Sequence, residues 1–367
     1  MPIFLGSAVH SSALVDSNGQ LIENSPYVNH LKGANGVVYK TLTPESEGLW
    51  NSIQTAQYLF DFGNIDKIVN WADAHNMEIY YAHLCWGGPM GNGHYWDIPL
   101  WAEPFKTGWM NGTLHVLQDF IITTIVRYKD RVHNWNIVNE FASTSGGYSP
   151  DNFWYQAINA RNSSLDYMEK ACEAAKWADP TARLWLNENF WPDVNLSKAK
   201  IDFVFQRAQS LRNKGYNIVG IGVQGHWKYE ASWAARGVPK DSVMYEFMNR
   251  CVSEGFKLRF SEFDFLIPTI PGTTPKQPDC TCINISGSTE CCINTQEWCY
   301  WHVCNNIYHA PTLNSQPLVE DFMTWQFSDN HAAWSEGRYA NYGCPLPLDR
   351  NYVPKPAWNG IRTGVHI

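Results

Sequence analysis

Residues 132–140 read VHNWNIVNE, an apolar run rich in β-forming residues that ends in Asn139 and Glu140. Similar runs recur along the 367-residue chain. Helical patterns lie between most of them, such as Leu117, Ile121 and Ile125 at a spacing of four. Strands that alternate with helices predict parallel pairing. The eight predicted strands are residues 3–9, 36–42, 78–86, 132–140, 183–189, 218–227, 257–265 and 321–328.

Eight such units with no break in composition predict one closed (β/α)8 TIM barrel of the α/β class rather than two open sheets. The connections agree with a barrel. Segments that follow strands, such as 87–112 and 141–164, are long and rich in Gly, Pro and Trp, whereas the returns from helix to strand are short. Long loops of the first kind build the active face of a barrel. We therefore expect one catalytic domain over residues 1–367, with a cysteine-rich insert at about 279–304 after the seventh strand.

The composition narrows the class of partner. The chain is 44% hydrophobic and 17% charged, which favours a large ordered core. A net charge of −8 with no Lys/Arg-rich run argues against nucleic acid or an anionic membrane as a partner, and no apolar run reaches the length of a membrane helix. We expect a monomer. Sugar binding is one explanation for the 18 Trp residues, because a flat ring stacks on the apolar face of a pyranose, although core packing accounts for more than half of them.

Six of the ten cysteines lie between Cys280 and Cys304. The favoured interpretation is a local disulfide knot in an oxidising compartment, hence a secreted protein, and the sequence does not choose among the possible pairings. A zinc site using His302 is the alternative, but the spacing fits no usual ligand pattern. The other cysteines are buried thiols or further bridges: Cys85, Cys172, Cys251 and Cys344. Asn-x-Ser/Thr sequons at Asn111, Asn162, Asn195 and Asn284 suggest a glycoprotein, although this number barely exceeds chance.

Two predicted strands end in a glutamate in a polar setting. The first ends at Glu140, and the second ends Ser261-Glu262-Phe263-Asp264. Catalytic groups of a barrel lie at the C-terminal ends of its strands. A single Glu there is more often a solvated rim residue, but two carboxylates across the mouth are the equipment of a retaining glycosidase.

A spacing of two along a strand places side chains on one face, so Glu262 and Asp264 point together, as do Gln224 and His226. Asp264 would then fix the tautomer of His226, and His226 would donate to Glu262 and keep it ionised. The alternative is that His226 is a satisfied core histidine and Gln224 a polar residue that fills the barrel. The spacing does not choose between these interpretations.

The ordered set of motifs along the chain resembles glycoside hydrolase family 10, the endo-β-1,4-xylanase family with a (β/α)8 barrel. The resemblance covers nearly the whole chain. It rests on Thr43-Pro44-Glu45, Trp135-x-x-x-Asn139-Glu140, Asn187-Glu188-Asn189, Gly220-Ile221-Gly222-Val223-Gln224-Gly225-His226, Ser261-Glu262-Phe263-Asp264, residues 325–329, and Pro345-Leu346 through Pro354-Lys355-Pro356.

The resemblance implies roles for particular residues. Glu140 matches the acid/base, Glu262 the nucleophile, and Asn139 the donor to the 2-hydroxyl of the sugar at the cleavage point. Neither a cofactor nor a metal is needed for this chemistry. Gln224, His226 and Asp264 match the supporting network, and the substrate-binding positions are Glu45, His83, Trp86, Trp325 and Trp334.

The chain also departs from the family pattern on the non-reducing side of the substrate. Ser46 and Leu49 stand where the family has Asn and Lys, Gly87 replaces a second His, and Gln326 replaces a Gly. His83 aligns with the family His only if the strand shifts by one residue. We expect a remodelled glycone pocket, with space beside Gly87 for the hydroxymethyl of a hexose.

Three functions follow from these observations. The first is hydrolysis of plant xylan, and the second is the same mechanism on a hexose-bearing plant β-glycoside, either a cello-oligosaccharide or a saponin glycan as in a tomatinase. The third is a non-catalytic sugar-binding barrel, which the presence of both Glu140 and Glu262 disfavours.

Overall fold

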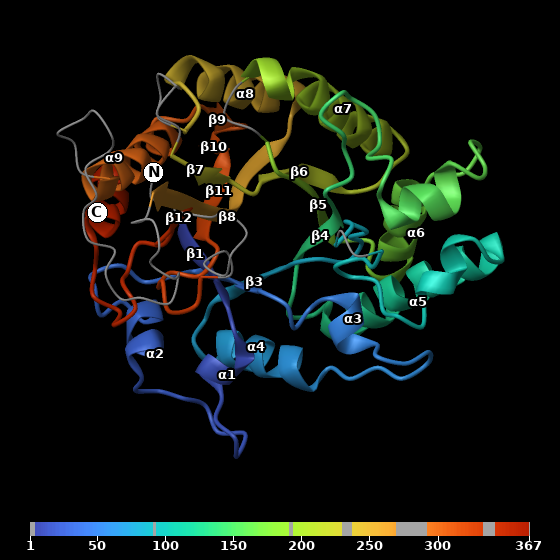
Figure 1. Ribbon diagram of the computed structural model, residues 1–367, viewed down its shortest axis with the longest axis horizontal. Coiled ribbons are helices and arrows are strands. Elements are labelled where there is room, and N and C mark those ends of the chain that lie inside the picture. Colours follow the sequence, from blue (N-terminus) through green and yellow to red (C-terminus); the bar gives the residue numbers. More distant parts are fainter. Residues whose placement is uncertain are drawn as a thin grey trace.

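The computed structural model describes residues 4–90, 93–190, 194–229, 237–268, 292–332 and 342–366. Within these residues, eight parallel strands form a closed barrel in the order β11-β1-β2-β3-β4-β5-β6-β8, and pairing of β8 with β11 closes it (Figure 1). The predicted fold class is therefore confirmed. The strands are β1 (Phe4–Val9), β2 (Thr41–Pro44), β3 (Glu78–Tyr81), β4 (Asn134–Asn139), β5 (Arg183–Glu188), β6 (Ile218–Val223), β8 (Lys257–Pro268) and β11 (Val319–Thr324).

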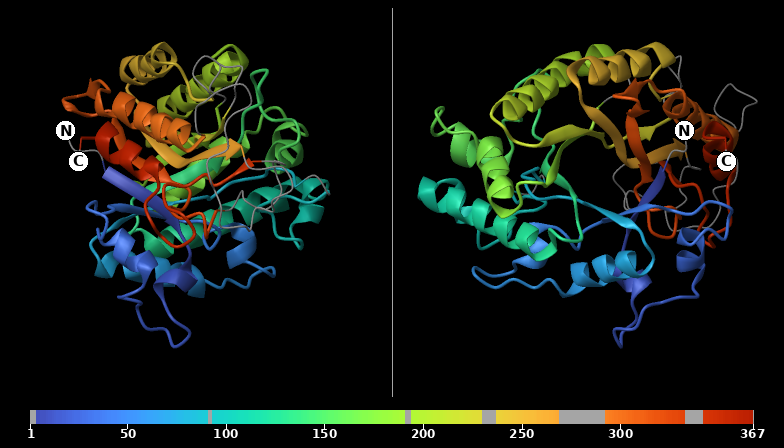
Figure 2. Two further views of the ribbon diagram at one scale, coloured as in Figure 1. Left: turned by 60° about the vertical axis from the view of Figure 1, so that its left-hand side comes forward. Right: turned by 180° about the vertical axis from the view of Figure 1, so that it is seen from behind.

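Helices surround the barrel on its outer side, as Figures 1 and 2 show from several directions. They bury one apolar face against the strands; in α5, for example, Leu117, Ile121 and Ile125 are all buried, as their spacing predicts. The helices are α1 (Ser11–Leu14), α2 (Pro26–Leu31), α3 (Trp50–Ile53), α4 (Gly63–Ala74), α5 (Met110–Tyr128), α6 (Tyr167–Ala178), α7 (Val194–Asn213), α8 (Asp241–Glu254), α9 (Cys292–Tyr308) and α10 (Pro356–Gly364), with a short 3-10 helix at Glu103–Lys106 and a short π-helix at Tyr155–Asn159.

Some predicted strands are longer than the observed ones. The run 36–42 becomes a strand only at Thr41, and the run 78–86 ends as a strand at Tyr81. The run 218–227 divides into β6 and the short strand β7 (His226–Lys228), because Gly225 between them has a positive φ of 79°. In the described parts of the chain, three further short strands lie outside the barrel: β9 (Thr312–Leu313), β10 (Gln316–Pro317) and β12 (Tyr342–Gly343).

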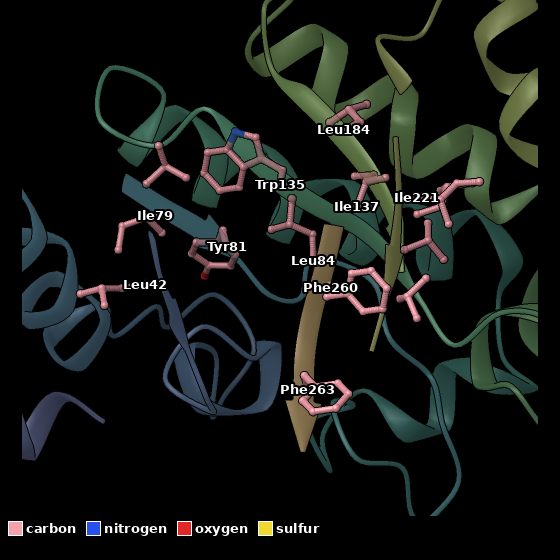
Figure 3. Close-up of a cluster of buried hydrophobic side chains, with 14 of the residues drawn as sticks. Leu42, Ile79, Tyr81, Leu84, Trp135, Ile137, Leu184, Ile221, Phe260 and Phe263 are labelled. Atoms are coloured by element: carbon pink, nitrogen blue, oxygen red, sulfur yellow. The ribbon is translucent and has the colours of Figure 1, made fainter. Parts of the chain in front are cut away.

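The main hydrophobic core lies between the barrel strands and the helices. Figure 3 shows part of it, where Leu42, Ile79, Trp135 and Ile221 come from different strands, and all of them are buried. A smaller cluster of Tyr80, Ala82, Trp185 and Met323 forms a separate group. The excess of Trp is thus partly structural, as expected, since Trp50, Trp71, Trp135, Trp154 and Trp185 are among the largest fully buried side chains.

A buried ion pair lies at the opposite end of the strands from their C-terminal ends. Arg259, near the start of β8, is 1% exposed and donates from Nε to Asp321 Oδ1 at 2.6 Å. Its guanidinium also lies over the rings of Tyr80 and Trp185, 4.2 and 4.3 Å from their centroids. We call this group, Arg259, Asp321, Tyr80 and Trp185, the base cluster. All four side chains are buried, and Arg259 Nη1 and Tyr80 Oη have no hydrogen-bond partner among the described residues.

The expected cysteine knot falls mostly outside the described residues, which omit 269–291. Cys304 on α9 is a buried free thiol, so it takes no part in the predicted disulfide knot. Cys85, Cys172 and Cys251 are also buried free thiols, whereas Cys344 is disulfide-bonded. His302 makes a 2.8 Å hydrogen bond with the Pro239 carbonyl. In the part of the chain that is described, no cluster of His, Cys, Asp and Glu has the composition to hold a metal, and no helix is long and apolar enough to cross a membrane.

Candidate active site

Four neighbouring strands bring polar side chains to the mouth of the barrel. Glu140 directly follows β4, Asn187 is near the end of β5, Gln224 directly follows β6, and Glu262 lies within β8. Glu140 has a left-handed backbone with φ of 51°, and its N–H donates to the Asn187 carbonyl at 3.1 Å. The chain therefore turns sharply at Glu140, directly after the strand.

Glu262 is buried and accepts two hydrogen bonds, one on each carboxylate oxygen. Asn187 Nδ2 donates to Oε1 at 2.7 Å, and His226 Nε2 donates to Oε2 at 3.1 Å. The other ring nitrogen, His226 Nδ1, donates to Asp264 Oδ2 at 3.0 Å. The register of β7 against β8 pairs His226 with Asp264 and explains this contact. His226 thus bridges two carboxylates, as the network interpretation of the spacing predicts, and is not an isolated core histidine.

The charges of this group stabilise one another. Burial alone would lower the pKa of His226, but attraction to Asp264 and Glu262 raises it to about 10. The bridging imidazole is therefore protonated at neutral pH. Burial would raise the pKa of Glu262, yet the hydrogen bond from His226 and the nearby positive charge lower it below its ordinary value. Glu262 is accordingly held as an anion with both oxygens oriented.

Glu140 has a different environment. It is partly exposed, and it accepts hydrogen bonds from Trp86 Nε1 on Oε2 at 2.8 Å and from Gln224 Nε2 on Oε1 at 3.1 Å. Both donors are neutral, unlike the imidazolium that holds Glu262. The two glutamates of the mouth thus have unequal surroundings, which is the arrangement that assigns two carboxyl groups to different tasks.

A chain of amides joins the two glutamates. Asn139 Oδ1 accepts from Asn187 Nδ2 at 2.9 Å and from Gln224 Nε2 at 3.2 Å. The Nδ2 group of Asn139 is buried and has no protein partner. A buried donor without a partner costs free energy, so an N–H group of this kind at a site points to a ligand acceptor.

Asn187 is the site residue that the sequence analysis missed, although its motif was noted. Its Oδ1 accepts from Ser261 Oγ at 2.6 Å, which orients Nδ2 toward Glu262. Gly222 on the neighbouring strand makes room for this side chain, because a Cβ atom there would overlap Asn187 Oδ1. A signal was present in the sequence: an Asn near the C-terminal end of a predicted strand, with glycines on the next one.

Aromatic side chains line the mouth beside the glutamates. His83 is buried, its Nδ1 accepts from Asn136 Nδ2 at 2.5 Å, and burial lowers its pKa, so it is a neutral acceptor. Its ring lies 5.4 Å from that of Trp86 and 6.5 Å from that of Trp325, both measured between centroids. The structure therefore places His83 between the two predicted wall residues. Trp334, the remaining predicted wall residue, lies outside the described residues.

The surroundings of Gly87 differ from the expectation. A Cβ atom at this position would come within 3.0 Å of both Asn152 Oδ1 and the Phe153 backbone nitrogen, and Phe153 N–H donates to the Gly87 carbonyl at 2.9 Å. The loop after β4 thus packs directly against Gly87. The prediction of open space for a hydroxymethyl group beside Gly87 is wrong along the direction that a side chain would take, because a segment distant in sequence fills it.

Glu45, the predicted substrate-binding residue after β2, lies on another part of the rim. Its Oε2 atom contacts His10 Nε2 at 3.0 Å and accepts from Gln326 Nε2 at 2.6 Å. Ser46 is exposed and Leu49 is half-buried, so neither supplies a buried polar side chain to this rim. Gln326, noted above as a departure, therefore takes part in the polar contacts of this region.

A family model and several known proteins match most of this chain. A model described as "Glycosyl hydrolase family 10" matches residues 8–363. The endo-1,4-beta-xylanase B of Thermotoga neapolitana is 28% identical over 331 residues, which cover 88% of this chain and 80% of that protein. Among solved structures, native xylanase 10B from Thermotoga maritima is 25% identical with a TM-score of 0.76, and the match covers 100% of this chain and 95% of that one. Xylanase 10B from Thermotoga petrophila RKU-1 in complex with xylobiose is also 25% identical, with a TM-score of 0.75 and coverage of 100% and 94%.

Proposed function

The chain belongs to glycosyl hydrolase family 10, and on this premise we propose that it is a retaining endo-β-1,4-xylanase that acts on plant xylan. The observation that carries the proposal is the unequal setting of the two glutamates. Glu262 is buried and held as an anion by His226 and Asn187, and Glu140 is partly exposed between Trp86 and Gln224. Support for xylan as substrate comes from the relatives, which are named as xylanases, and from the neighbour solved with xylobiose.

In the first step, a Glu262 oxygen attacks the anomeric carbon of the sugar at the cleavage point. The bond from that carbon to the glycosidic oxygen breaks, and Glu140 gives its proton to the departing oxygen. The products are a covalent glycosyl ester on Glu262 and an ionised Glu140. The charged His226 assists because it has already oriented Glu262 before the attack.

In the second step, Glu140 takes a proton from water while the water oxygen attacks the same anomeric carbon. The ester bond to Glu262 breaks, and both glutamates return to their initial states. Two displacements restore the original anomeric configuration. Asn139 Nδ2, the buried donor without a protein partner, has the chemistry to bind a sugar hydroxyl in both steps.

A hexose-bearing β-glycoside is the second candidate substrate. It is favoured by Ser46, Leu49 and Gln326 at rim positions where the family resemblance implies Asn, Lys and Gly. It no longer has support from open space at Gly87, which Asn152 and Phe153 fill. This candidate keeps the mechanism and changes only the substrate.

Product analysis on xylan, cellohexaose and a steroidal saponin, assayed in parallel, tests the substrate. Proton NMR during the first turnovers tests the stereochemistry, because the β-anomer must appear first if the enzyme retains configuration. We expect xylo-oligosaccharides as the main products and only slow cleavage of the hexosides. Rapid hydrolysis of a hexoside with none of xylan would favour the second candidate, and an initial α-anomer would exclude the two-step mechanism.

We further propose that the protein is secreted, glycosylated and monomeric. The clustering of six cysteines within 25 residues and the disulfide at Cys344 support an oxidising compartment. Mass mapping of the purified protein, with and without reduction, tests the disulfides and the sequons together. Free thiols at every cysteine would contradict the secreted location.

A further inference from the structure

A buried ion pair lies next to the segment that carries Glu140. Glu188 is the last residue of β5, which pairs with β4, and its side chain is fully buried (Figure 1). Lys200 on α7 contacts Glu188 Oε2 through Nζ at 2.6 Å, and its side chain is 11% exposed. Lys200 Nζ also donates to the Asn189 carbonyl at 2.8 Å. We call Glu188 and Lys200 the support pair. The two-step mechanism proposed above uses neither side chain.

The other oxygen of Glu188 holds the chain just after Glu140. Glu188 Oε1 accepts from the backbone N–H of Ala142 at 2.6 Å. The N–H of Glu140 itself donates to the Asn187 carbonyl at 3.1 Å. Two consecutive residues of β5 therefore hold residues 140–142 at both ends, one through its backbone carbonyl and the other through its carboxylate.

The segment 140–142 depends on such contacts for its shape. Glu140 has a left-handed backbone with φ of 51°, which is uncommon for a residue other than Gly. A conformation of this kind persists where the surrounding structure fixes it. Phe141 and Ala142, which follow, are both buried. Glu188 thus supplies the acceptor that the buried N–H of Ala142 requires, and the turn at Glu140 is kept.

Glu188 is linked to Glu140 by a second route and by charge. Its backbone carbonyl accepts from the Gln224 N–H at 3.0 Å, and Gln224 Nε2 donates to Glu140 Oε1 at 3.1 Å. Burial raises the pKa of Glu188, Lys200 opposes this increase, and the charge of Glu140 adds to it. The carboxyl groups of Glu188 and Glu140 are therefore close enough to interact.

We propose that Glu188, held by Lys200, is a positioning residue that directs the carboxyl group of Glu140 toward the glycosidic oxygen. This inference rests on the proposed function, in which Glu140 protonates that oxygen. Glu188 is too deeply buried to contact a sugar, so it acts through Glu140. A carboxylate suits the task because one oxygen accepts strongly from the Ala142 N–H, while Lys200 compensates for the buried charge at the other.

The first test uses two double variants that differ in one acceptor. Glu188→Met/Lys200→Met removes both charges and the acceptor for Ala142, whereas Glu188→Gln/Lys200→Met removes both charges and keeps an oxygen there. Neither leaves an uncompensated buried charge, so both are expected to fold, as circular dichroism melting will show. If the Met/Met variant does not fold, Glu188→Leu/Lys200→Met replaces it, because Leu also lacks the acceptor.

The two variants are compared on phenyl and 2,4-dinitrophenyl β-xylobioside, which share their sugars. Phenolate needs a proton to depart, whereas dinitrophenolate leaves without one. In the Met/Met variant, kcat/KM on the phenyl substrate should fall about 10–100-fold, because the acid is misplaced. The fall on the dinitrophenyl substrate should be less than about threefold, and the Gln/Met variant should stay within about threefold of wild type on both.

A matched control neutralises a buried ion pair at the other end of the barrel. Arg259→Met/Asp321→Leu alters the base cluster, which has no contact with the segment 140–142 among the described residues. Any change in kcat/KM of this control should be the same on the phenyl and dinitrophenyl substrates. The comparison separates loss of a buried pair in general from loss of the support pair.

The second test uses azide, because Glu140 also acts as the base of the second step. In the Met/Met variant, kcat on the dinitrophenyl substrate should fall, since water attacks slowly without a well-placed base. Azide needs no base: its nitrogen bonds to the anomeric carbon while the ester bond to Glu262 breaks, and the product is a β-glycosyl azide. Azide should therefore raise kcat of the Met/Met variant but not that of wild type, and NMR identifies the product.

Equal losses of kcat/KM on the two xylobiosides would show that the support pair only stabilises the fold, and would overturn the inference. Unchanged kcat/KM of the Met/Met variant on the phenyl substrate, or no effect of azide, would do the same. A failure of the proposed function looks different, because the wild type would then cleave neither xylobioside. The comparison is in that case repeated with the phenyl and dinitrophenyl β-cellobiosides, where the same dependence on the leaving group is expected and its absence overturns the inference.

Discussion

The two ends of the barrel use buried charges differently. In the base cluster, Arg259 is bonded to Asp321 at 2.6 Å and covered by the rings of Tyr80 and Trp185. At the mouth, Glu262 is bonded just as closely, but its neighbours leave Asn139 Nδ2 without a partner and Glu140 partly exposed. The base cluster is closed to solvent, although Arg259 Nη1 and Tyr80 Oη have no hydrogen-bond partner in the described part of the chain, whereas the mouth has an unpartnered donor beside a partly exposed carboxyl group.

This difference shows what each end is for. In a buried ion pair that solvent does not reach, loss of one member leaves the other as an uncompensated charge and lowers stability. A buried donor without a protein partner costs stability at either end, but a ligand can complete it only at the mouth, beside the partly exposed Glu140. We therefore expect substitutions at the base to change stability more than activity, and substitutions at the mouth to change activity more than stability.

The largest expected effect is at the mouth. Glu262→Gln removes the nucleophile while keeping its shape, so kcat on xylan should fall by about 10⁴-fold or more. The melting temperature, followed by circular dichroism, should change by only a few degrees. Residual activity above one tenth of wild type would place the nucleophile elsewhere.

The next largest effect is at the base. Arg259→Met leaves Asp321 as an uncompensated buried charge, and the free energy of unfolding should fall by about 3–5 kcal/mol. Denaturant titration measures this loss, and kcat of the folded fraction should stay within about threefold of wild type. Arg259→Met combined with Asp321→Leu should recover much of the stability. A large loss of kcat in the double variant would show that the two ends are coupled.

A smaller effect on activity is expected when the imidazolium that binds Glu262 is removed. In His226→Asn, the pKa of Glu262 should rise, because its hydrogen bond from the imidazolium and the positive charge are lost. Since Glu262 must be ionised to attack, the acid limb of kcat/KM should move to higher pH, with a fall of about 10–100-fold at neutral pH. Rate profiles from pH 3 to 9 measure the shift. An unchanged acid limb would show that His226 does not lower the pKa of Glu262.

His226→Asn should also change how the free energy of unfolding depends on pH. The pKa of His226 is raised from 6.5 to about 10 on folding, so its contribution is fully present below pH 6.5 and is lost as pH rises toward 10. The unfolding free energy of wild type should therefore decline over that window more steeply than that of His226→Asn. Denaturant titrations at pH 6, 8 and 10 compare the two proteins. If the unfolding free energies of the two proteins varied equally with pH, the assignment of the charge to His226 would be contradicted.

The smallest effect concerns Gly88. A Cβ atom there would lie 2.8 Å from Trp86 Nε1 and 3.3 Å from Glu140 Oε2, so Gly88→Ala should displace the Trp86 hydrogen bond to Glu140. We expect kcat to fall by about 3–10-fold, with little change in melting temperature. Gly63→Ala at the start of α4 is the matched control, since it meets only the Asp61 side chain. Equal kcat values of the two variants would show that the hydrogen bond from Trp86 to Glu140 does not contribute to catalysis.

The amino-acid pattern predicts the architecture and part of the site, because both depend on local periodicity. Alternating strands and helices predict the barrel, and a spacing of two predicts that Glu262 and Asp264 share a face, as Gln224 and His226 do. The predicted strand boundaries are less accurate, as at residues 36–42, because β2 begins only at Thr41, where it pairs with β1 and β3.

Other features depend on contacts between distant parts of the chain, which periodicity does not encode. Gln326 meets Glu45 across 281 residues, and Asn187 meets Glu262 across 75. The sequence alone predicts open space beside Gly87, but folding places Phe153 against it. Closure of the barrel makes the ends of β1, β2 and β11 neighbours, and side-chain packing then determines which donors reach each carboxylate.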